Sequence, residues 1–117
     1  NKEAEGFLKA DTFDTGYGQA RLSAEGSISV DVCSLDQMIE ENDLPPPDIV
    51  KIDVEGNELM VLEGFGKNLK QVNHLFIELH EKGDYDYNDV INLLEEQGFK
   101  TEQSWSGPDD KTFYLSN

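Results

Sequence analysis

Residues 48–58 read Asp-Ile-Val-Lys-Ile-Asp-Val-Glu-Gly-Asn-Glu, and this stretch decides how the 117-residue chain is expected to fold. Its first seven residues are almost continuous in isoleucine and valine, which is typical of a central parallel strand covered on both faces. Gly56 allows a sharp turn after the strand, and Leu59, Met60 and Leu62 follow in helical spacing. The stretch therefore predicts a strand, a turn and a helix in direct succession.

Strands and helices alternate along most of the chain. Apolar patterns predict strands at residues 28–32, 48–54, 75–79, 99–105 and 111–115. Helices are expected to begin at the capping box of Ser34 and Gln37, near Glu58 and at Tyr87. Gly98 is expected to end the third helix in the left-handed conformation. This order predicts an α/β fold with a mostly parallel sheet, right-handed crossovers and a terminal antiparallel hairpin.

The length predicts a single domain over residues 1–117, because domains usually contain about 100–150 residues. We expect an irregular strand and loop over residues 1–26, with a short strand at 6–10 and a bend at 16–18. An α/β core is expected over residues 27–117. No apolar run approaches the roughly 20 residues of a membrane-spanning helix.

The charge balance argues against two classes of partner. The chain has 25 acidic and 9 basic side chains, for a formal charge of −16, and Arg21 is its only arginine. Binding to duplex nucleic acid or to an anionic membrane requires clustered lysine and arginine side chains. We therefore expect neither nucleic acid nor a membrane as a partner.

The acidity has two interpretations that the sequence weighs about equally. One is a salt-adapted, halophilic source, and the other is an ordinary acidic cytosolic protein. Acidic groups lie on average roughly 16 Å apart, beyond the Debye length of about 8 Å at physiological salt but within the roughly 30 Å at 0.01 M. A thermal midpoint that does not rise with added salt would count against the first interpretation.

Cys33 is the only cysteine, which excludes an internal disulfide and a cysteine-cluster metal site. No histidine lies near it in the sequence, so we expect a packed structural thiol and not a nucleophile. A single cysteine fits a reducing compartment, and a cytoplasmic location is expected on that basis.

Four titratable side chains lie where the two central strands are predicted to end. Asp53 and Glu55 end the first strand, and Glu78 and His80 end the second. In parallel sheets, ligands bind beyond the carboxyl ends of the strands, and sequential strands usually lie side by side. We therefore expect these four side chains to share one edge of the sheet as a candidate site, with Lys51 close behind Asp53.

Several of these residues also have a structural interpretation. Glu55 can cap the following helix, because an anion at a helix N-terminus is favourable by about 0.3–1 kcal/mol. Lys51 can pair with a carboxylate that offsets its burial in the strand. His74 precedes its strand and is expected on the surface. A hydrolytic triad has weak support, since no serine lies in a nucleophile elbow.

The same residues resemble those of the FkbM-type methyltransferases. That family shows a Leu-Asp pair, a KIDVEGxE strand, turn and helix, a following LxG, and a strand with Glu-hydrophobic-His. The matching residues here are Ser34-Leu35-Asp36, residues 48–58, Val61-Leu62-Glu63-Gly64, Ile77-Glu78-Leu79-His80 and Gly98-Phe99. The resemblance covers roughly residues 27–115, and residues 51–58 are its specific part.

The resemblance implies a Rossmann-like class I methyltransferase sheet with S-adenosylmethionine as cofactor. The implied reaction is O-methylation of a small molecule or a sugar. Asp53 is then expected closest to the transferred methyl group, with Glu78 or His80 as the base. Asp53, Glu55 and Gly56 are expected to contact the cofactor, and no metal ligand is implied.

One part of the family pattern is not found. A glycine-rich turn after a hydrophobic strand and an acidic residue for the ribose would normally approach the cofactor, and neither is present. We therefore expect the carboxyl-terminal portion of such an enzyme, without its first three strands. A piece of this kind is expected to fold but to lack most of the cofactor affinity and to be catalytically inactive.

Two other classes of function stay open. A metal-dependent enzyme would hold Mg²⁺ or Mn²⁺ with Asp53, Glu55, Glu78 and His80, because these ions prefer oxygen-rich sites. A non-catalytic acidic interaction module would instead use an exposed sheet edge, which is a template for self-association. Titration calorimetry with the ions and with S-adenosylmethionine tests the first class, and light scattering tests the second.

Overall fold

The computed structural model describes residues 4–10, 20–23, 28–81 and 85–117. Within these residues the strands are β1 (Ala4–Ala10), β2 (Ala20–Ser23), β3 (Ile28–Val32), β4 (Ile49–Ile52), β5 (His74–His80), β6 (Lys100–Ser106) and β7 (Asp110–Ser116). The helices are α1 (Leu35–Glu41), α2 (Glu58–Gly64), the 3-10 helix η1 (Gly66–Gln71) and α3 (Tyr87–Glu96). The predicted alternation of strands and helices from residue 28 onward is confirmed.

The larger sheet has four strands in the order β4-β5-β7-β6. Only β4 and β5 are parallel, while β7 runs antiparallel to both β5 and β6. The described sheet is therefore mixed, and the prediction of a mostly parallel sheet is not confirmed. The predicted hairpin of β6 and β7 is confirmed, and its second strand lies next to β5. β7 takes the inner position because it carries the buried Phe113 and Leu115, whereas β6 is exposed along most of its length.

The remaining strands form a second, antiparallel sheet in the order β2-β1-β3. The strand predicted at residues 28–32 is correct, but it pairs with β1 and not with the sheet that contains β4. The short strand predicted at residues 6–10 is part of β1, whereas β2 was not predicted. The bend predicted at residues 16–18 lies outside the described residues.

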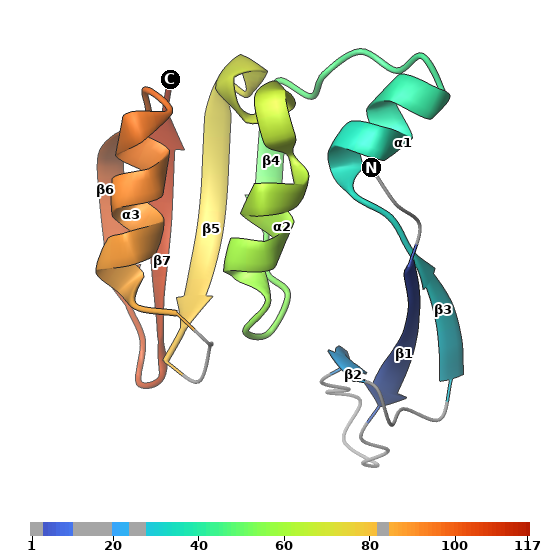
Figure 1. The fold of residues 1–117 in the computed structure, drawn as a ribbon. Coiled ribbons are helices and arrows are strands. Elements are labelled where there is room, and N and C mark those ends of the chain that lie inside the picture. Colours follow the sequence, from blue (N-terminus) through green and yellow to red (C-terminus); the bar gives the residue numbers. More distant parts are fainter. Residues whose placement is uncertain (1–3, 11–19, 24–27, 82–84) are drawn as a thin grey trace.

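Helices α2 and α3 lie on the same face of the four-stranded sheet (Figure 1). The core fills the space between this face and the helices, and β5 contributes most to it through Leu75, Ile77 and Leu79, none of which is exposed. Buried residues from the other elements complete the core: Ile52, Leu62, Phe65, Leu69, Val72, Val90, Leu94, Phe99, Phe113 and Leu115.

β4 is covered on one face, which corrects the prediction that it is covered on both. Ile52 is buried and Val50 is half-buried, but Ile49 is 66% exposed and Lys51 is exposed. Successive side chains of a strand point to opposite faces, and the described helices α2 and α3 cover only one of them. Lys51 therefore needs no buried carboxylate partner.

Two further predictions about single residues have mixed outcomes. The Ser34 side chain accepts a hydrogen bond from the Gln37 backbone N–H at 3.1 Å, as expected of an N-cap, but the Gln37 amide donates to Glu41 instead of closing the capping box. Cys33 is exposed and not packed, because Val30 and Val32 take the inward positions of the alternation that precedes it. No helix among the described residues has the length and apolar character that crossing a membrane requires.

Gly98 follows α3 with φ 99°, as predicted for a left-handed helix end. A Cβ at this position would also lie 2.9 Å from Oδ1 of Asn117. We expect Gly98→Ala to lower the free energy of unfolding by about 1–2 kcal/mol, because the left-handed conformation is strained for residues with a Cβ. Urea denaturation measures the change.

Gly64 provides the matched control for this prediction. It ends α2, and an added Cβ would meet its nearest neighbour, Cβ of Ser34, at an ordinary 3.7 Å. Gly64→Ala is therefore expected to leave stability unchanged or slightly raised, since alanine favours helix. Equal losses in the two variants would contradict the conformational explanation for Gly98.

Candidate functional site

The carboxyl ends of β4 and β5 lie side by side. In their parallel register, Lys51 is opposite Phe76 and Ile52 is opposite Ile77. Asp53 follows β4 directly, and Glu78 follows Ile77 within β5. Both carboxylates therefore lie at the same end of two adjacent parallel strands.

Nε2 of His80 is the point on which the predicted site residues converge. It lies 3.7 Å from Oδ1 of Asp53, 3.6 Å from Oε2 of Glu55 and 3.8 Å from Oε1 of Glu78. These separations are longer than a hydrogen bond but close enough for strong electrostatic interaction. The structure thus brings together all four titratable residues that the sequence analysis singled out.

The turn after β4 explains how Glu55 reaches this group. Glu55 has φ 55° and Gly56 has φ 103°, so two successive residues adopt positive φ. This reversal directs the chain from β4 into α2, while the side chains of Asp53 and Glu55 stay 34% and 38% exposed. His80 is more enclosed, with 15% of its side chain exposed.

Glu58 also belongs to the site, although the sequence indicates it only as the start of a helix and as the last residue of the KIDVEGxE motif. Its side chain is fully buried, and its Oε1 lies 2.7 Å from Nδ1 of His80. The same oxygen accepts a hydrogen bond from the Gly56 N–H at 3.0 Å. The turn N–H is thus bound by Glu58, whereas the Glu55 carboxylate lies near Nε2 of His80.

Two tyrosines link the start of α3 to the same end of the sheet. The Tyr85 hydroxyl donates to Oε2 of Glu58 at 2.5 Å and accepts from the His80 backbone N–H at 2.8 Å. The Tyr87 hydroxyl donates to the Leu79 carbonyl at 3.1 Å. The apolar spacing of α3 predicts that Tyr87 lies on the apolar face of this helix. No pattern in the sequence around Tyr85 indicates its role.

The pKa values in the site reflect its burial and its excess of carboxylates. Burial raises the pKa of Glu58, but hydrogen bonds from Tyr85, Gly56 and His80 outweigh it and hold the pKa below the ordinary value. Burial lowers the pKa of His80, but the hydrogen bond to Glu58 and the nearby carboxylates outweigh it and raise the pKa. Glu58 is therefore an ionised acceptor at neutral pH.

Glu78 is the exception among the carboxylates. Burial, together with the neighbouring Asp110 and Asp53, raises the pKa of Glu78 to about 7. Its ordinary value is about 4.3, so the folded state binds the Glu78 proton more tightly than the unfolded state does. The bound proton of Glu78 therefore adds to the free energy of unfolding. This contribution is complete at pH values below the ordinary pKa and is lost as the pH rises through about 7.

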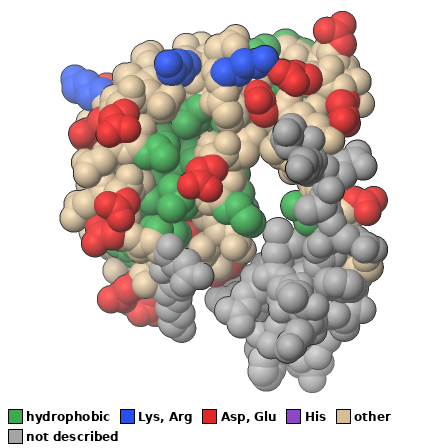
Figure 2. All heavy atoms as spheres, viewed as in Figure 1, with side chains coloured by type: hydrophobic (Ala, Val, Ile, Leu, Met, Phe, Trp, Pro, Cys, Tyr) green, Lys and Arg blue, Asp and Glu red, His purple; other side chains and the backbone are tan. Residues whose placement is uncertain are grey.

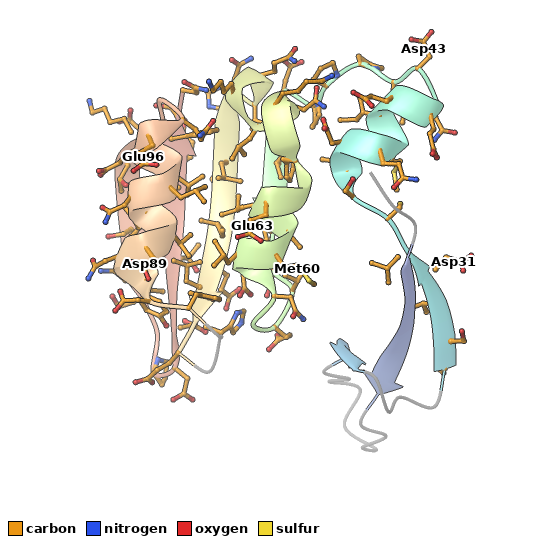
Figure 3. All side chains as sticks on the ribbon, in the orientation of Figure 1. Asp31, Asp43, Met60, Glu63, Asp89 and Glu96 are labelled. Atoms are coloured by element: carbon orange, nitrogen blue, oxygen red, sulfur yellow. The ribbon has the colours of Figure 1, made fainter. Side chains whose placement is uncertain are left out.

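We expect Glu78→Gln to remove this loss of stability, because glutamine imitates the protonated carboxyl. In chelator-containing buffer, the variant should melt higher than the wild type above pH about 7 and similarly to it near pH about 4. Glu63→Gln is the control, since Glu63 is exposed on α2 (Figure 3). If the melting temperatures of the wild type and of Glu78→Gln changed in the same way with pH over the whole pH range, the raised pKa of Glu78 would be contradicted.

Charge is distributed unevenly over the described surface. Figure 2 shows the lysine side chains of this face at its top, which is the amino end of β5, with acidic side chains both beside them and over the rest of the face. The carboxyl end of β5 lies at the opposite end of the same strand. The carboxylates of Asp53, Glu55 and Glu78 at this end favour a positively charged group beside them.

Three of the residues also form a group that could hold a metal ion. Asp53, Glu55 and His80 each offer one ligand atom, and these atoms lie within 4.8 Å of one another. Glu78 is not part of this group. Two carboxylates and an imidazole suit Mn²⁺ or a similar divalent ion.

Gly56 is also expected to contact a cofactor. Its N–H is already hydrogen-bonded to Glu58, so Gly56 can contribute only the close approach of a backbone without a side chain.

Comparisons with known proteins agree with one another. A family model described as Methyltransferase FkbM domain matches residues 2–101. Hexuronic acid methyltransferase AglP of Haloferax volcanii is 40% identical over 85 residues, which cover 73% of this chain and 35% of that protein. The chain thus spans about a third of the length of this curated relative. No solved structure matches the chain.

Proposed function

Because this chain belongs to the FkbM methyltransferase family, we propose that the group around His80 serves S-adenosylmethionine-dependent O-methylation. The observation that carries the proposal is the convergence of Asp53, Glu55 and Glu78 on Nε2 of His80 at 3.6–3.8 Å. The relative's name is that of a hexuronic acid methyltransferase, so we propose a hydroxyl group of a sugar acid as the acceptor.

The donor set fits the proposed cofactor. S-adenosylmethionine, when bound, supplies an electrophilic methyl group on a positively charged sulfur. Carboxylates stabilise such a cation and also accept hydrogen bonds from ribose or acceptor hydroxyls. Asp53 and Glu55, both partly exposed, are proposed for these contacts, and the bare Gly56 backbone permits close approach.

His80 is the proposed base. A hydroxyl oxygen that gains a methyl group must lose its proton, and an imidazole takes it up efficiently when its pKa lies near the working pH. Nε2 is the ring nitrogen that faces the exposed carboxylates, while Nδ1 is bound to Glu58. Glu78, with its pKa of about 7, is the alternative base.

The test uses the full-length protein and S-adenosylmethionine that carries an isotopically labelled methyl group. We expect labelled methyl to appear on free hexuronic acids or on oligosaccharides that contain them, as detected by mass spectrometry. Neutral hexoses are the matched control acceptors. Absence of label from every sugar acid, with binding of S-adenosylmethionine demonstrated by calorimetry, would exclude this acceptor class.

A metal-assisted form of the reaction is the second candidate, and the spacing of Asp53, Glu55 and His80 favours it. Titration calorimetry with Mg²⁺ and with Mn²⁺ tests it. A saturable site that Asp53→Asn removes and Glu63→Gln keeps would support metal assistance. Binding that the two variants reduce equally would indicate only general attraction by an acidic surface.

The exposed edge of the sheet supports one further proposal about partners. β4 is an outer strand of the described four-stranded sheet, so its outer side has no strand partner among the described residues. We propose self-association of the 117-residue chain through this edge. Light scattering should give a mass that increases with concentration, and a constant monomer mass would contradict the proposal.

A further inference from the structure

Glu58 is a fully buried carboxylate that cannot contact a substrate. A buried charge is tolerated only when its oxygens are hydrogen-bonded or paired, and Glu58 meets this condition completely. Oε1 accepts from the Gly56 N–H at 3.0 Å and lies 2.7 Å from Nδ1 of His80, and Oε2 accepts from Tyr85 at 2.5 Å. Its contacts with the candidate site are the His80 ring and the Gly56 N–H, and His80 is the only titratable residue of the site to which it is hydrogen-bonded among the described residues.

The hydrogen bonds of Glu58 fix the protonation of the imidazole ring. An ionised carboxylate only accepts hydrogen bonds, so at a distance of 2.7 Å the proton must be on Nδ1 of His80. In a neutral ring, Nε2 then carries the lone pair. This is the nitrogen 3.6–3.8 Å from Asp53, Glu55 and Glu78.

Tyr85 prevents Glu58 and His80 from moving apart. Its hydroxyl donates to Glu58 and at the same time accepts the backbone N–H of His80. A single side chain therefore ties the carboxylate to the backbone of the residue that it orients. Rotation of the His80 ring would break the bond to Glu58 and leave a buried oxygen of this carboxylate with one partner fewer.

We propose that Glu58 is a positioning residue that keeps the proton of neutral His80 on Nδ1 and directs the lone pair of Nε2 toward Asp53, Glu55 and Glu78. The inference rests on the proposed methyl transfer. As the methyl carbon exchanges its bond to sulfur for a bond to the acceptor oxygen, the hydroxyl proton of the acceptor passes to Nε2. The resulting imidazolium is stabilised by Glu58, and neutral S-adenosylhomocysteine is released.

Nuclear magnetic resonance provides the direct test. The chain contains two histidines, so long-range proton–nitrogen correlation spectra of the 117-residue protein resolve both rings. The spectra are recorded in chelator at a pH where both rings are neutral. We expect His80 to be protonated on Nδ1 in the wild type. A wild-type His80 protonated on Nε2 would overturn the proposal without any variant.

Glu58→Gln tests the cause of this preference. The neutral amide is a weaker acceptor and presents a donor at one of its two positions, so we expect a measurable population of His80 protonated on Nε2. Glu63→Gln, an exposed change on the same helix, should leave the spectrum as in the wild type (Figure 3). An unchanged His80 ring in a folded Glu58→Gln protein would contradict the proposal.

Kinetics of the full-length protein connect the positioning role to the reaction. Glu58→Gln is expected to lower kcat by about 10–100-fold, the range typical for a group that orients a functional histidine, with little change in the KM of the acceptor. A wild-type protein with the expected ring but without methyl transfer would refute the proposed function alone. An active wild type with the opposite ring would refute the positioning role alone.

Discussion

His80→Ala is expected to lower kcat for methyl transfer by about 10²–10⁴-fold in the full-length protein, because it removes the proposed base. The acceptor's proton would then have to pass to water or to Glu78. Neither of these is fixed in orientation by a buried carboxylate, as the His80 ring is by Glu58. Asp53→Asn should also reduce turnover, since it removes a carboxylate 3.7 Å from the same nitrogen. Initial rates with labelled S-adenosylmethionine measure both effects.

His74→Ala is the matched control. His74 begins the same strand, β5, but lies exposed at the opposite end, where its Nδ1 is 3.0 Å from the Tyr114 hydroxyl. Its replacement should leave kcat unchanged. If His80→Ala were as fast as His74→Ala, His80 would not be the base, and an Asp53→Asn enzyme with full turnover would place Asp53 outside the site.

Glu58→Ala is expected to cause the largest loss of stability, about 3–5 kcal/mol, because it removes one partner from a buried, charged hydrogen-bond network. The change leaves the Tyr85 hydroxyl, the Gly56 N–H and Nδ1 of His80 without their common acceptor. A loss of this size is a large share of the roughly 5–15 kcal/mol that stabilises a typical domain. Urea denaturation, followed by circular dichroism, measures it.

Two variants make this prediction specific. Tyr85→Phe removes the hydrogen bond to the charged Glu58 and also the acceptor of the His80 backbone N–H, and should cost at least about 1.5–3 kcal/mol. Glu63→Ala changes an exposed carboxylate of the same helix and should stay within about 0.5 kcal/mol of the wild type. A Glu58→Ala protein as stable as Glu63→Ala would show that the network does not stabilise the fold.

Much of the local structure could be predicted because its signals are local. Continuous isoleucine and valine mark β4, Gly56 lies in the turn predicted for it, Gly98 has the predicted positive φ, and helical spacing marks α3. The sheet order could not be predicted in the same way. The position of β7 beside β5 depends on a comparison of the two hairpin strands, because Phe113 and Leu115 make β7 the strand that buries more apolar surface.

The candidate site shows the same division between local and distant information. Asp53, Glu55, Glu78 and His80 could be grouped because the ends of adjacent parallel strands must meet. The role of Glu58 could not be predicted, because the sequence shows it only as the first residue of a helix and the last residue of the KIDVEGxE motif. Its actual partners are 22 and 27 residues further along the chain, and only the packing of α2 against β5 brings them within reach.

The burial of Glu58 sets a limit for anyone who wishes to engineer this protein. Apolar residues of matched volume often stabilise a fold when they replace a buried ionic network, so an apolar triple replacement of Glu58, His80 and Tyr85 is an attractive route to thermostability. The same replacement would erase the orientation of the imidazole on which the proposed chemistry depends. At this end of the sheet, thermal stability and catalytic activity depend on the same three side chains, so neither can be improved without affecting the other.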